Sequence, residues 1–220
     1  MIIAIDGPAA SGKSTAAVGV AKRLGITYLD TGAMYRAVTF GLIDNQIGFK
    51  NSLEIENFLE KIEIKFSENQ IGTFITLNGR DITNVIRSEA VTKNVSEVSA
   101  LNSVRKSMVL IQRKMAEVDD CILEGRDIGT VVFPNADFKF FLTADKKSRA
   151  ERRLNDLKAI GEKSSVEKVM YDLISRDHKD STRSHSPLKK SDDAIIIDTS
   201  ELGINKVIDK IVNIVKHKGH

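Results

Sequence analysis

Residues 7–15 (GPAASGKST) combine flexible glycines with a lysine and hydroxyl side chains at a spacing that suits phosphate chemistry. They match G-x-x-x-x-G-K-S/T, in which the backbone turns so that successive N–H groups face phosphate oxygens. In this pattern Lys13 contacts the β- and γ-phosphates, and the Ser14 hydroxyl is a ligand for Mg²⁺. We therefore expect a nucleoside triphosphate to bind Gly7, Pro8, Ala9, Ala10, Ser11, Gly12, Lys13, Ser14 and Thr15.

Acidic side chains follow several short apolar runs that are typical of buried strands. These runs end at Asp6, Asp30, Glu124 and Asp198. The carboxyl ends of parallel strands lie at one edge of a sheet, where ligands bind in such folds. We therefore expect the four acids to share one site.

Basic residues lie near the same predicted strand ends. Arg36 follows the second apolar run, and Arg126 stands next to Asp127 after the third. Further on, Arg176 and Arg183 flank Asp180 at positions i, i+4 and i+7, which share one face of a helix. Solvated helix faces and tight loops are the simpler interpretation of any one of these segments. Together they favour a second anionic substrate.

The elements that must position these residues alternate along the chain. We expect strands at residues 2–5, 26–29, 121–123, 138–142 and 194–197. We expect helices at residues 13–24, 33–45, 52–61, 88–100, 102–118, 146–159 and 204–216, and one more that Ser164 or Ser165 caps. Strands separated by helices predict a parallel sheet with helices on both faces. Residues 62–77 alternate in polarity and predict an antiparallel hairpin.

The predicted fold class is thus α/β, a P-loop NTPase with a five-stranded parallel sheet flanked by helices. We expect one domain over residues 1–220, with its core in residues 1–30, 119–145 and 193–220. The hairpin belongs to a small antiparallel β insertion in the region of residues 31–105. A short lid is expected at residues 155–165, around Gly161.

Composition limits the class of protein further. The chain has 220 residues, 41% of them hydrophobic, and a net charge of +3, which is too small to indicate nucleic-acid binding by itself. No apolar stretch approaches the ~20 residues that span a membrane. The single cysteine, Cys121, excludes an internal disulfide and suits a reducing compartment. We expect a cytoplasmic monomer with no nucleic-acid or membrane partner.

Two classes of P-loop protein remain, a kinase for a small molecule and a nucleotide-hydrolysing regulator. GTP switches usually carry D-x-x-G and N-K-x-D, and the sequence contains neither at the required spacing. The abundance of arginine favours a kinase whose two substrates are both phosphorylated.

Four segments carry a family resemblance: DGPAASGKST, LDTGAMYRA, EGRDIGTVVFPNAD and SRDHKDSTRSHSPLKKSDDA. Their order and spacing across nearly the whole chain resemble bacterial cytidylate kinases. The resemblance implies transfer of the γ-phosphate of ATP to CMP or dCMP, in pyrimidine nucleotide metabolism. It also implies that the β insertion binds CMP and that the lid moves. A kinase for UMP or AMP is the nearest alternative.

The resemblance also implies roles for individual residues. The CMP-binding residues would be Thr31, Arg36, Ser96, Arg105, Arg126, Asp127, Arg176, Asp180 and Arg183. Ser96, Arg105 and Asp127 would contact the cytosine, and Arg176, Asp180 and Arg183 the ribose and phosphate. Thr31 stands where the family often has Ser, and Glu124 stands where it has Asp. Glu124 would then reach Mg²⁺ through water.

The mechanism expected from these residues needs no base, because a phosphate monoester is largely dianionic at neutral pH. Catalysis would be positioning and charge neutralisation by Lys13, Arg126, Arg152 and Arg153, with Mg²⁺ as the cofactor. We expect the four histidines, His178, His185, His217 and His220, to be surface residues.

Overall fold

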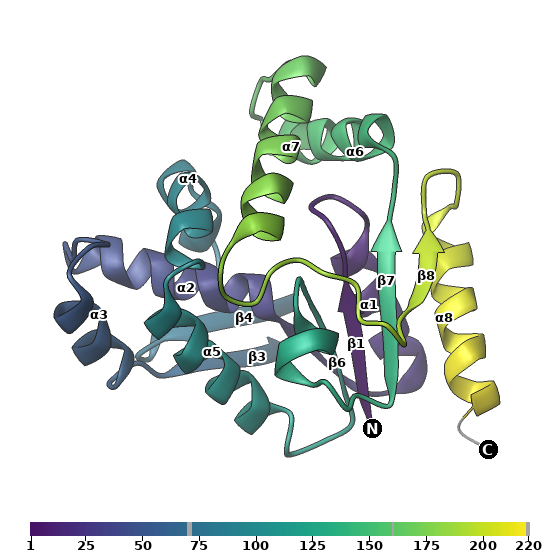
Figure 1. The fold of residues 1–220 in the computed structure, drawn as a ribbon, viewed down its shortest axis with the longest axis horizontal. Helices are drawn as coiled ribbons and strands as arrows, with labels where there is room; N and C mark the ends of the chain where they lie inside the picture. Colours follow the sequence, from purple (N-terminus) through teal and green to yellow (C-terminus); the bar gives the residue numbers. More distant parts are fainter. Residues whose placement is uncertain (70–71, 160, 219–220) are drawn as a thin grey trace. The chain divides into compact units, whose positions relative to one another are not determined.

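A computed structural model describes residues 1–69, 72–159 and 161–218, and the chain divides into two compact units (Figure 1). Unit 1 contains Met1–Leu29 and Ala116–His220, and unit 2 contains Asp30–Met115. The phosphate loop and the segments 124–130 and 176–183 all belong to unit 1.

Unit 1 is built on a parallel sheet. Among the described residues its strand order is β2-β6-β1-β7-β8, formed by β1 (Ile2–Asp6), β2 (Thr27–Asp30), β6 (Cys121–Gly125), β7 (Phe138–Thr143) and β8 (Ile195–Asp198). The central strand β1 pairs in parallel with β6, Ile3 opposite Ile122, and with β7, Ile3 opposite Phe138. Apolar residues run through these strands because helices cover both faces. The predicted α/β fold with five parallel strands is confirmed.

Two helices close one side of this sheet. The buried face of α1 (Lys13–Leu24) packs with α8 (Ile204–Lys218) in one apolar cluster. A Cβ at Gly19 would lie 2.2 Å from Cδ1 of Ile208, so glycine lets the two helices approach closely. Gly25 ends α1 in the left-handed conformation, and its N–H donates to the Ala21 carbonyl at 2.9 Å. This packing fixes α1, and with it the C-terminal end of the phosphate loop.

A second helix pair follows β7. The helices α6 (Lys146–Ala159) and α7 (Val166–Thr182) lie beyond the arrowhead of β7 in Figure 1. Ser165 caps α7 by accepting a hydrogen bond from the Lys168 N–H at 3.2 Å, as the sequence predicts. Ala150 and Leu154 of α6 pack against Val169 of α7. The expected lid corresponds to the connection between these helices, of which residue 160 lies outside the described residues.

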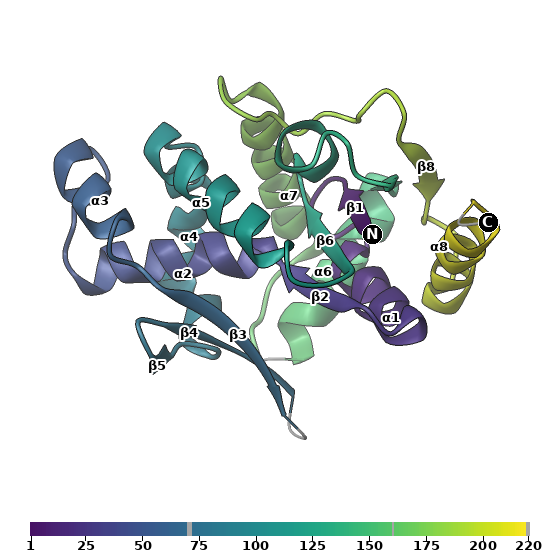
Figure 2. The same ribbon diagram turned by 90° about the horizontal axis from the view of Figure 1, so that it is seen from below.

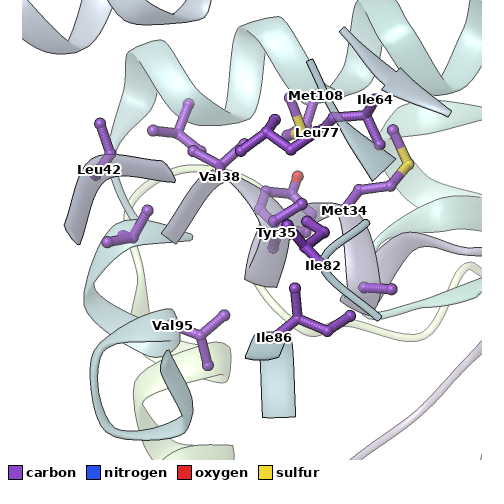
Figure 3. Close-up of a cluster of buried hydrophobic side chains, with 14 of the residues drawn as sticks. Met34, Tyr35, Val38, Leu42, Ile64, Leu77, Ile82, Ile86, Val95 and Met108 are labelled. Carbon is purple, nitrogen blue, oxygen red and sulfur yellow. The ribbon is translucent and has the colours of Figure 1, made fainter. Parts of the chain in front are cut away.

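Unit 2 consists of short helices around a small antiparallel sheet (Figure 2). Its sheet has the order β3-β4-β5, formed by β3 (Ile64–Asn69), β4 (Gly72–Leu77) and β5 (Arg80–Asp81). Its helices are α2 (Thr31–Asp44), α3 (Ser52–Leu59), α4 (Glu89–Val98), α5 (Asn102–Met115) and the short turn η1 (Val85–Arg87). Figure 3 shows Met34, Val38 and Leu42 of α2 inside its core, near residues of the sheet.

Two features of unit 2 differ from the sequence-based expectation. The predicted hairpin is present, with Ile64 opposite Leu77, although residues 70–71 lie outside the described residues. The strand β5 was not predicted, because two residues are too few to show alternation. The helix that begins at Asn102 was predicted to end at residue 118, whereas α5 ends at Met115.

Across residues 1–69, 72–159 and 161–218, each helix is too short or too polar to cross a lipid bilayer. The three histidines that the structure describes, His178, His185 and His217, are exposed, as expected. His220 lies outside the described residues.

Gly41 in α2 offers a test of the core of unit 2. A Cβ at Gly41 would lie 2.3 Å from Cζ of Phe58 and 2.9 Å from Cδ2 of Leu77. We expect Gly41→Val to lower the free energy of unfolding by about 1–3 kcal/mol, because overpacking forces neighbours out of their rotamers. Urea denaturation measures this change.

The matched control is Gly48→Val, because Gly48 is exposed and no atom lies within 4 Å of a Cβ built there. We expect it to stay within about 0.5 kcal/mol of the parent protein. Equal stability of the two variants would show that the close packing around Gly41 does not constrain unit 2.

Candidate functional site

The phosphate loop joins β1 to α1 and depends on unusual backbone angles. Gly7 has φ 149°, and a Cβ there would lie 2.0 Å from the Leu142 carbonyl oxygen in β7. Gly12 has φ 87° at the start of α1. Ala10, although not glycine, has φ 58° in the left-handed region. The loop therefore needs glycine at its first position and holds one residue in a strained conformation.

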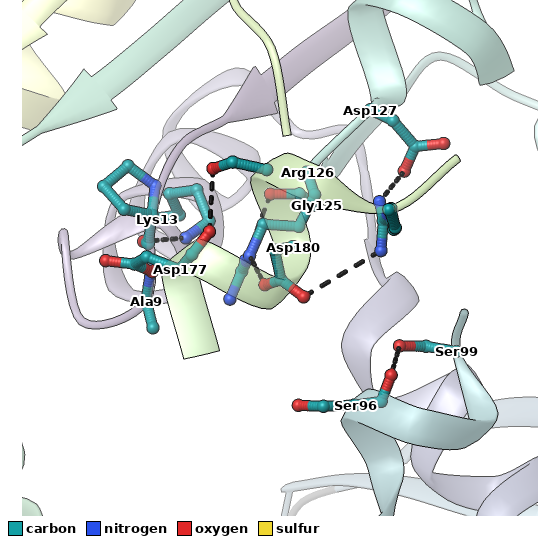
Figure 4. Close-up of polar contacts among 12 residues, drawn as sticks. Ala9, Lys13, Ser96, Ser99, Gly125, Arg126, Asp127, Asp177 and Asp180 are labelled. Atoms are coloured by element: carbon teal, nitrogen blue, oxygen red, sulfur yellow. Dashed lines mark hydrogen bonds and ion pairs between the residues drawn. The ribbon is translucent and has the colours of Figure 1, made fainter. Parts of the chain in front are cut away.

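Lys13 is buried at the first turn of α1. Its Nζ donates a hydrogen bond to the Pro8 carbonyl at 2.8 Å, across the loop (Figure 4). Burial, together with the positive charges of Arg126 and Arg176, lowers the pKa of Lys13 to about 7, although Glu124 and Asp6 oppose the decrease. Three cations thus lie within electrostatic reach of one another, an arrangement that an anionic ligand would stabilise.

Ser14 and Glu124 meet beside this lysine. The Ser14 hydroxyl donates to Oε1 of Glu124, and the Tyr28 hydroxyl donates to the same oxygen at 3.3 Å. Glu124 is buried at the carboxyl end of β6. A hydroxyl and a carboxylate beside a phosphate loop are oxygen ligands of the kind that Mg²⁺ prefers. The longer Glu side chain therefore suits the position where Asp was expected.

The other strand-end acids have different partners. The carboxylate of Asp6 accepts hydrogen bonds from the N–H groups of Ile128 at 2.8 Å and Gly129 at 2.7 Å. Burial raises its pKa to about 6, although these hydrogen bonds oppose the rise. Asp30 caps α2, and the exposed Asp198 accepts from Ser200.

That the four acids share one site stays a prediction. Glu124 contacts Ser14 of the phosphate loop. Asp6 and Asp198 accept hydrogen bonds from N–H groups of turns, and Asp6 also acts electrostatically on Lys13. Asp6 in this way positions the short π-helical turn η2 (Ile128–Val132), which the sequence analysis did not predict.

Arginines and aspartates form a charged network at the end of α7. Nε of Arg126 donates to Oδ2 of Asp180 at 2.9 Å, and the same carboxylate lies 4.0 Å from Nη1 of Arg183. Nη2 of Arg183 lies 3.6 Å from Oδ1 of Asp127. All four side chains are largely buried, so each carboxylate compensates a guanidinium that would otherwise be costly to bury.

This network connects α7 to the segment after β6. Arg176, Asp180 and Arg183 were predicted to share one helix face, and Asp180 pairs with Arg126. Figure 4 shows Asp180 beside Arg126, with Asp127 contacting the neighbouring arginine. Arg176 lies one turn before Asp180 and contributes to the lowered pKa of Lys13. The arginine cluster is thus electrostatically connected to the phosphate loop.

A pocket adjoins the phosphate loop. It has a volume of about 180 Å³ and is lined by Ser11, Gly12, Thr15, Arg152, Thr199, Leu202, Ile204 and Val207. Nη1 of Arg152 donates to the Thr199 hydroxyl at 2.9 Å, and that hydroxyl donates to the Ser11 carbonyl at 3.0 Å. Arg152 is therefore tied to the loop after β8, while Arg153 follows it on α6.

Sequence reasoning missed two further charged residues of this region. Arg149 of α6 and Asp177 of α7 form an ion pair, and both bind the main chain of Ala9. Ala9 was expected to offer its N–H to a phosphate, but that N–H donates to Asp177 at 3.0 Å. The place of Ala9 among the phosphate-binding residues stays a prediction, and its N–H has a partner within the protein.

Unit 2 holds the remaining predicted residues. Thr31 is buried at the first turn of α2, and Nη1 of Arg36 donates to the Thr92 hydroxyl at 3.1 Å. The guanidinium of Arg105 lies 5.1 Å from the ring centre of Tyr35, and Nη1 donates to the Ser99 carbonyl at 3.3 Å.

The other predicted residue of unit 2 lies close to this arginine. The Ser99 hydroxyl donates to the Ser96 carbonyl at 3.2 Å (Figure 4). Arg105 and Ser96 therefore belong to one region of unit 2, around the junction of α4 and α5.

A family model and similar known proteins indicate the same family. A family model described as cytidylate kinase matches residues 3–217. A cytidylate kinase of Halalkalibacterium halodurans is 48% identical over 99% of this chain and 98% of its own length. One from Carboxydothermus hydrogenoformans is 47% identical over the same shares of each chain.

Solved structures share the fold at low identity. A protein from Eubacterium ventriosum has a TM-score of 0.56 and 13% identity, covering 99% of this chain and 98% of its own. A shikimate kinase from Bacteroides thetaiotaomicron has a TM-score of 0.50 and 11% identity, covering 98% of each chain. These likenesses concern the fold alone.

The pKa of Lys13 predicts a proton-linked binding step. With its pKa near 7, Lys13 is mostly neutral at pH 8.5 in the empty site, and bound phosphates would raise its pKa. We expect binding of ADP at pH 8.5 to take up close to one proton. Calorimetry in buffers with different ionisation enthalpies measures this uptake.

Lys13→Met provides the comparison, because it removes the titrating group and keeps a chain of similar length. The uptake should disappear in this variant. If parent and variant exchange the same number of protons with the buffer, Lys13 is already charged in the empty site.

Proposed function

The chain belongs to the cytidylate kinase family, and we propose that it transfers the γ-phosphoryl group of ATP to CMP and dCMP through the residues described above. The observation that carries the assignment of residues is the gathering of Lys13, Arg126 and Arg176 within electrostatic reach of one another. Neighbouring positive charges strengthen the attraction for an anionic ligand. Two phosphorylated substrates would supply that negative charge.

The donor half of the proposal rests on the phosphate loop. The N–H groups from Ala10 onward, together with the N-terminus of α1, would bind the β- and γ-phosphates of ATP. Lys13 would exchange its hydrogen bond to Pro8 for a phosphate oxygen. The pocket beside Arg152 continues from the loop and has Leu202 and Val207 in its lining, which suits the nucleoside of ATP.

Mg²⁺ is the metal that this arrangement suits. Ser14 and Glu124 would hold it, Ser14 directly and Glu124 through water. When bound, the metal would supply neutralisation of the negative charge on the phosphates. Tyr28 supports the position by its hydrogen bond to Glu124.

The acceptor half rests on the arginine cluster. Arg126 and Arg183 would bind the CMP phosphate, whose dianion attacks the γ-phosphorus without a general base. Asp180 aligns both guanidinium groups before the substrate arrives, so little reorganisation is needed. Arg176 connects this cluster to Lys13 and is proposed to meet the substrate between them.

The arginines of α6 have separate proposed roles. Arg152 is tied to Thr199 beside the donor pocket, which favours a role in holding ATP. Arg153 follows it on the same helix and is proposed to contact the transferring phosphoryl group when the connection between α6 and α7 closes. Closure would exclude water, which otherwise competes as an acceptor.

Residues of unit 2 are proposed to recognise CMP itself. Arg105 and Ser96 would hydrogen-bond the cytosine, as the family resemblance implies. The contact of Arg105 with Tyr35 and Ser99 orients its guanidinium and supports a fixed role. Thr31 and Arg36 would contact the acceptor phosphate.

An acceptor panel tests the proposed reaction. We expect ADP release from ATP to depend strongly on CMP or dCMP and to be at least tenfold slower with UMP or AMP, because the base contacts would be lost. A coupled assay of ADP formation measures each rate. A rate that is independent of any acceptor would instead indicate a nucleotide-hydrolysing regulator.

Asp180→Asn tests the arginine cluster. It keeps the shape of the side chain but removes the charge that aligns Arg126 and Arg183. We expect the KM for CMP to rise about tenfold, which corresponds to about 1.4 kcal/mol, while the KM for ATP changes less than threefold.

Asp44→Asn is the matched control for this change. Asp44 also pairs with an arginine, Arg80, at 2.9 Å, but this pair is exposed. Exposed pairs contribute little, so the control should behave as the parent protein does. An equal rise of both KM values in Asp180→Asn would contradict a role on the acceptor side.

A further inference from the structure

We propose that Arg149 and Asp177 are positioning residues that hold Ala9 from both sides and so shape the phosphate loop. This inference rests on the proposed function, because it explains how the loop is kept ready for the donor phosphates. Neither side chain needs to touch the donor. They act through the main chain of Ala9.

The contacts form a closed ring of three residues. Oδ1 of Asp177 accepts a hydrogen bond from the Ala9 N–H at 3.0 Å. Nη1 of Arg149 donates to the Ala9 carbonyl at 3.1 Å, and the same group donates to Oδ2 of Asp177. Only 7% of the Arg149 side chain and 17% of the Asp177 side chain are exposed. Water therefore competes little for these bonds, and charged donors and acceptors make them strong.

The bond to Asp177 orients the peptide between Pro8 and Ala9. In a trans peptide the N–H and the carbonyl point to opposite sides of the chain. Because the Ala9 N–H points to Asp177, the Pro8 carbonyl of the same peptide points away from it. That carbonyl accepts the hydrogen bond from Lys13 at 2.8 Å. Asp177 thereby determines where the partner of the buried lysine lies.

The bond to Arg149 orients the next peptide. The Ala9 carbonyl points to Arg149, so the N–H of Ala10 points to the opposite side. Ala10 has φ 58°, a left-handed conformation that non-glycine residues disfavour. Such strain persists only when surrounding contacts determine the conformation. The ring around Ala9 supplies contacts of this kind directly before the strained residue.

The side chain of Ala9 is engaged as well. Its methyl group is buried in the apolar cluster that contains Ala150 and Leu154 of α6 and Leu173 of α7. Both polar main-chain groups and the side chain of Ala9 thus contact the same helix pair. The geometry of the phosphate loop therefore depends on the position of α6 and α7.

If the two residues only stabilised the fold, their substitution would lower the stability of the protein. It would leave the relative affinities for donor and acceptor unchanged. A positioning role predicts weaker binding of the donor nucleotide, because its N–H donors lose their orientation, with little change for CMP.

Asp177→Asn and Arg149→Met test the proposal with ADP and CMP as the probes. Asparagine can still accept from the Ala9 N–H but cannot pair with the Arg149 charge, and methionine fills similar space without any hydrogen bond. We expect the Kd for ADP to rise at least tenfold in Arg149→Met and at least threefold in Asp177→Asn. The Kd for CMP should change less than twofold. Calorimetry measures both, and thermal unfolding confirms that each variant is folded.

The double variant adds a second criterion. Because both residues act through Ala9, its loss of ADP affinity should be close to that of Arg149→Met and well below the product of the single effects. Arg23→Met and Asp209→Asn are the matched controls, since this exposed Arg–Asp pair joins α1 to α8 away from the phosphate loop. We expect both controls to bind ADP as the parent protein does.

An unchanged Kd for ADP in both single variants, or an equal loss of ADP and CMP affinity, would overturn the proposal. If Arg149→Met does not fold, the Kd of Asp177→Asn for ADP tests the proposal by itself. ADP binding needs no acceptor, so this result is independent of the acceptor panel. Failure of the parent protein to phosphorylate CMP would instead refute the proposed function.

Discussion

The structure of unit 1 depends on holding a nine-residue loop in a conformation that its residues do not prefer alone. Gly7 approaches the backbone of β7 so closely that a side chain cannot fit, and Ala10 adopts a left-handed conformation that alanine disfavours. The central strand β1 fixes one end of this loop, and the packing of α1 against α8 fixes the other. Both ends are therefore anchored in the core, so that the strain remains confined to the loop between them.

The same unit must also keep cations buried before any substrate is present. Burying an unpaired charge is costly, and each cation here has a specific partner. Lys13 donates a hydrogen bond to a main-chain carbonyl. Burial and two nearby arginines lower the pKa of Lys13, and a neutral amino group needs no anion as its partner. Arg126 and Arg183 instead pair with aspartates. The difference has a physical reason: a lysine can lose its proton, whereas the guanidinium of arginine stays charged and needs an anion.

Two aspartates of the helix α7 lie one turn apart and bind different parts of unit 1. Asp177 binds the phosphate loop through Ala9, and Asp180, one turn later, binds the arginines that are proposed to hold the acceptor. A single helix thus contacts both the phosphate loop and the arginine cluster, the proposed donor and acceptor sites of unit 1. This arrangement suits phosphoryl transfer, in which catalysis depends on bringing two charged substrates into line.

The sequence by itself determined the phosphate loop, the parallel α/β fold and membership of the cytidylate kinase family. Glycine spacing, apolar runs and helix caps involve residues that are close together in the sequence, so the sequence alone reveals them. It did not reveal the ring of Arg149, Asp177 and Ala9, or the use of Asp6 as a partner for the η2 turn. Only the tertiary structure decided these contacts, because Ala9 and Asp6 bind residues more than a hundred positions away. A charged side chain shows no sign in the sequence of which distant backbone group it will bind.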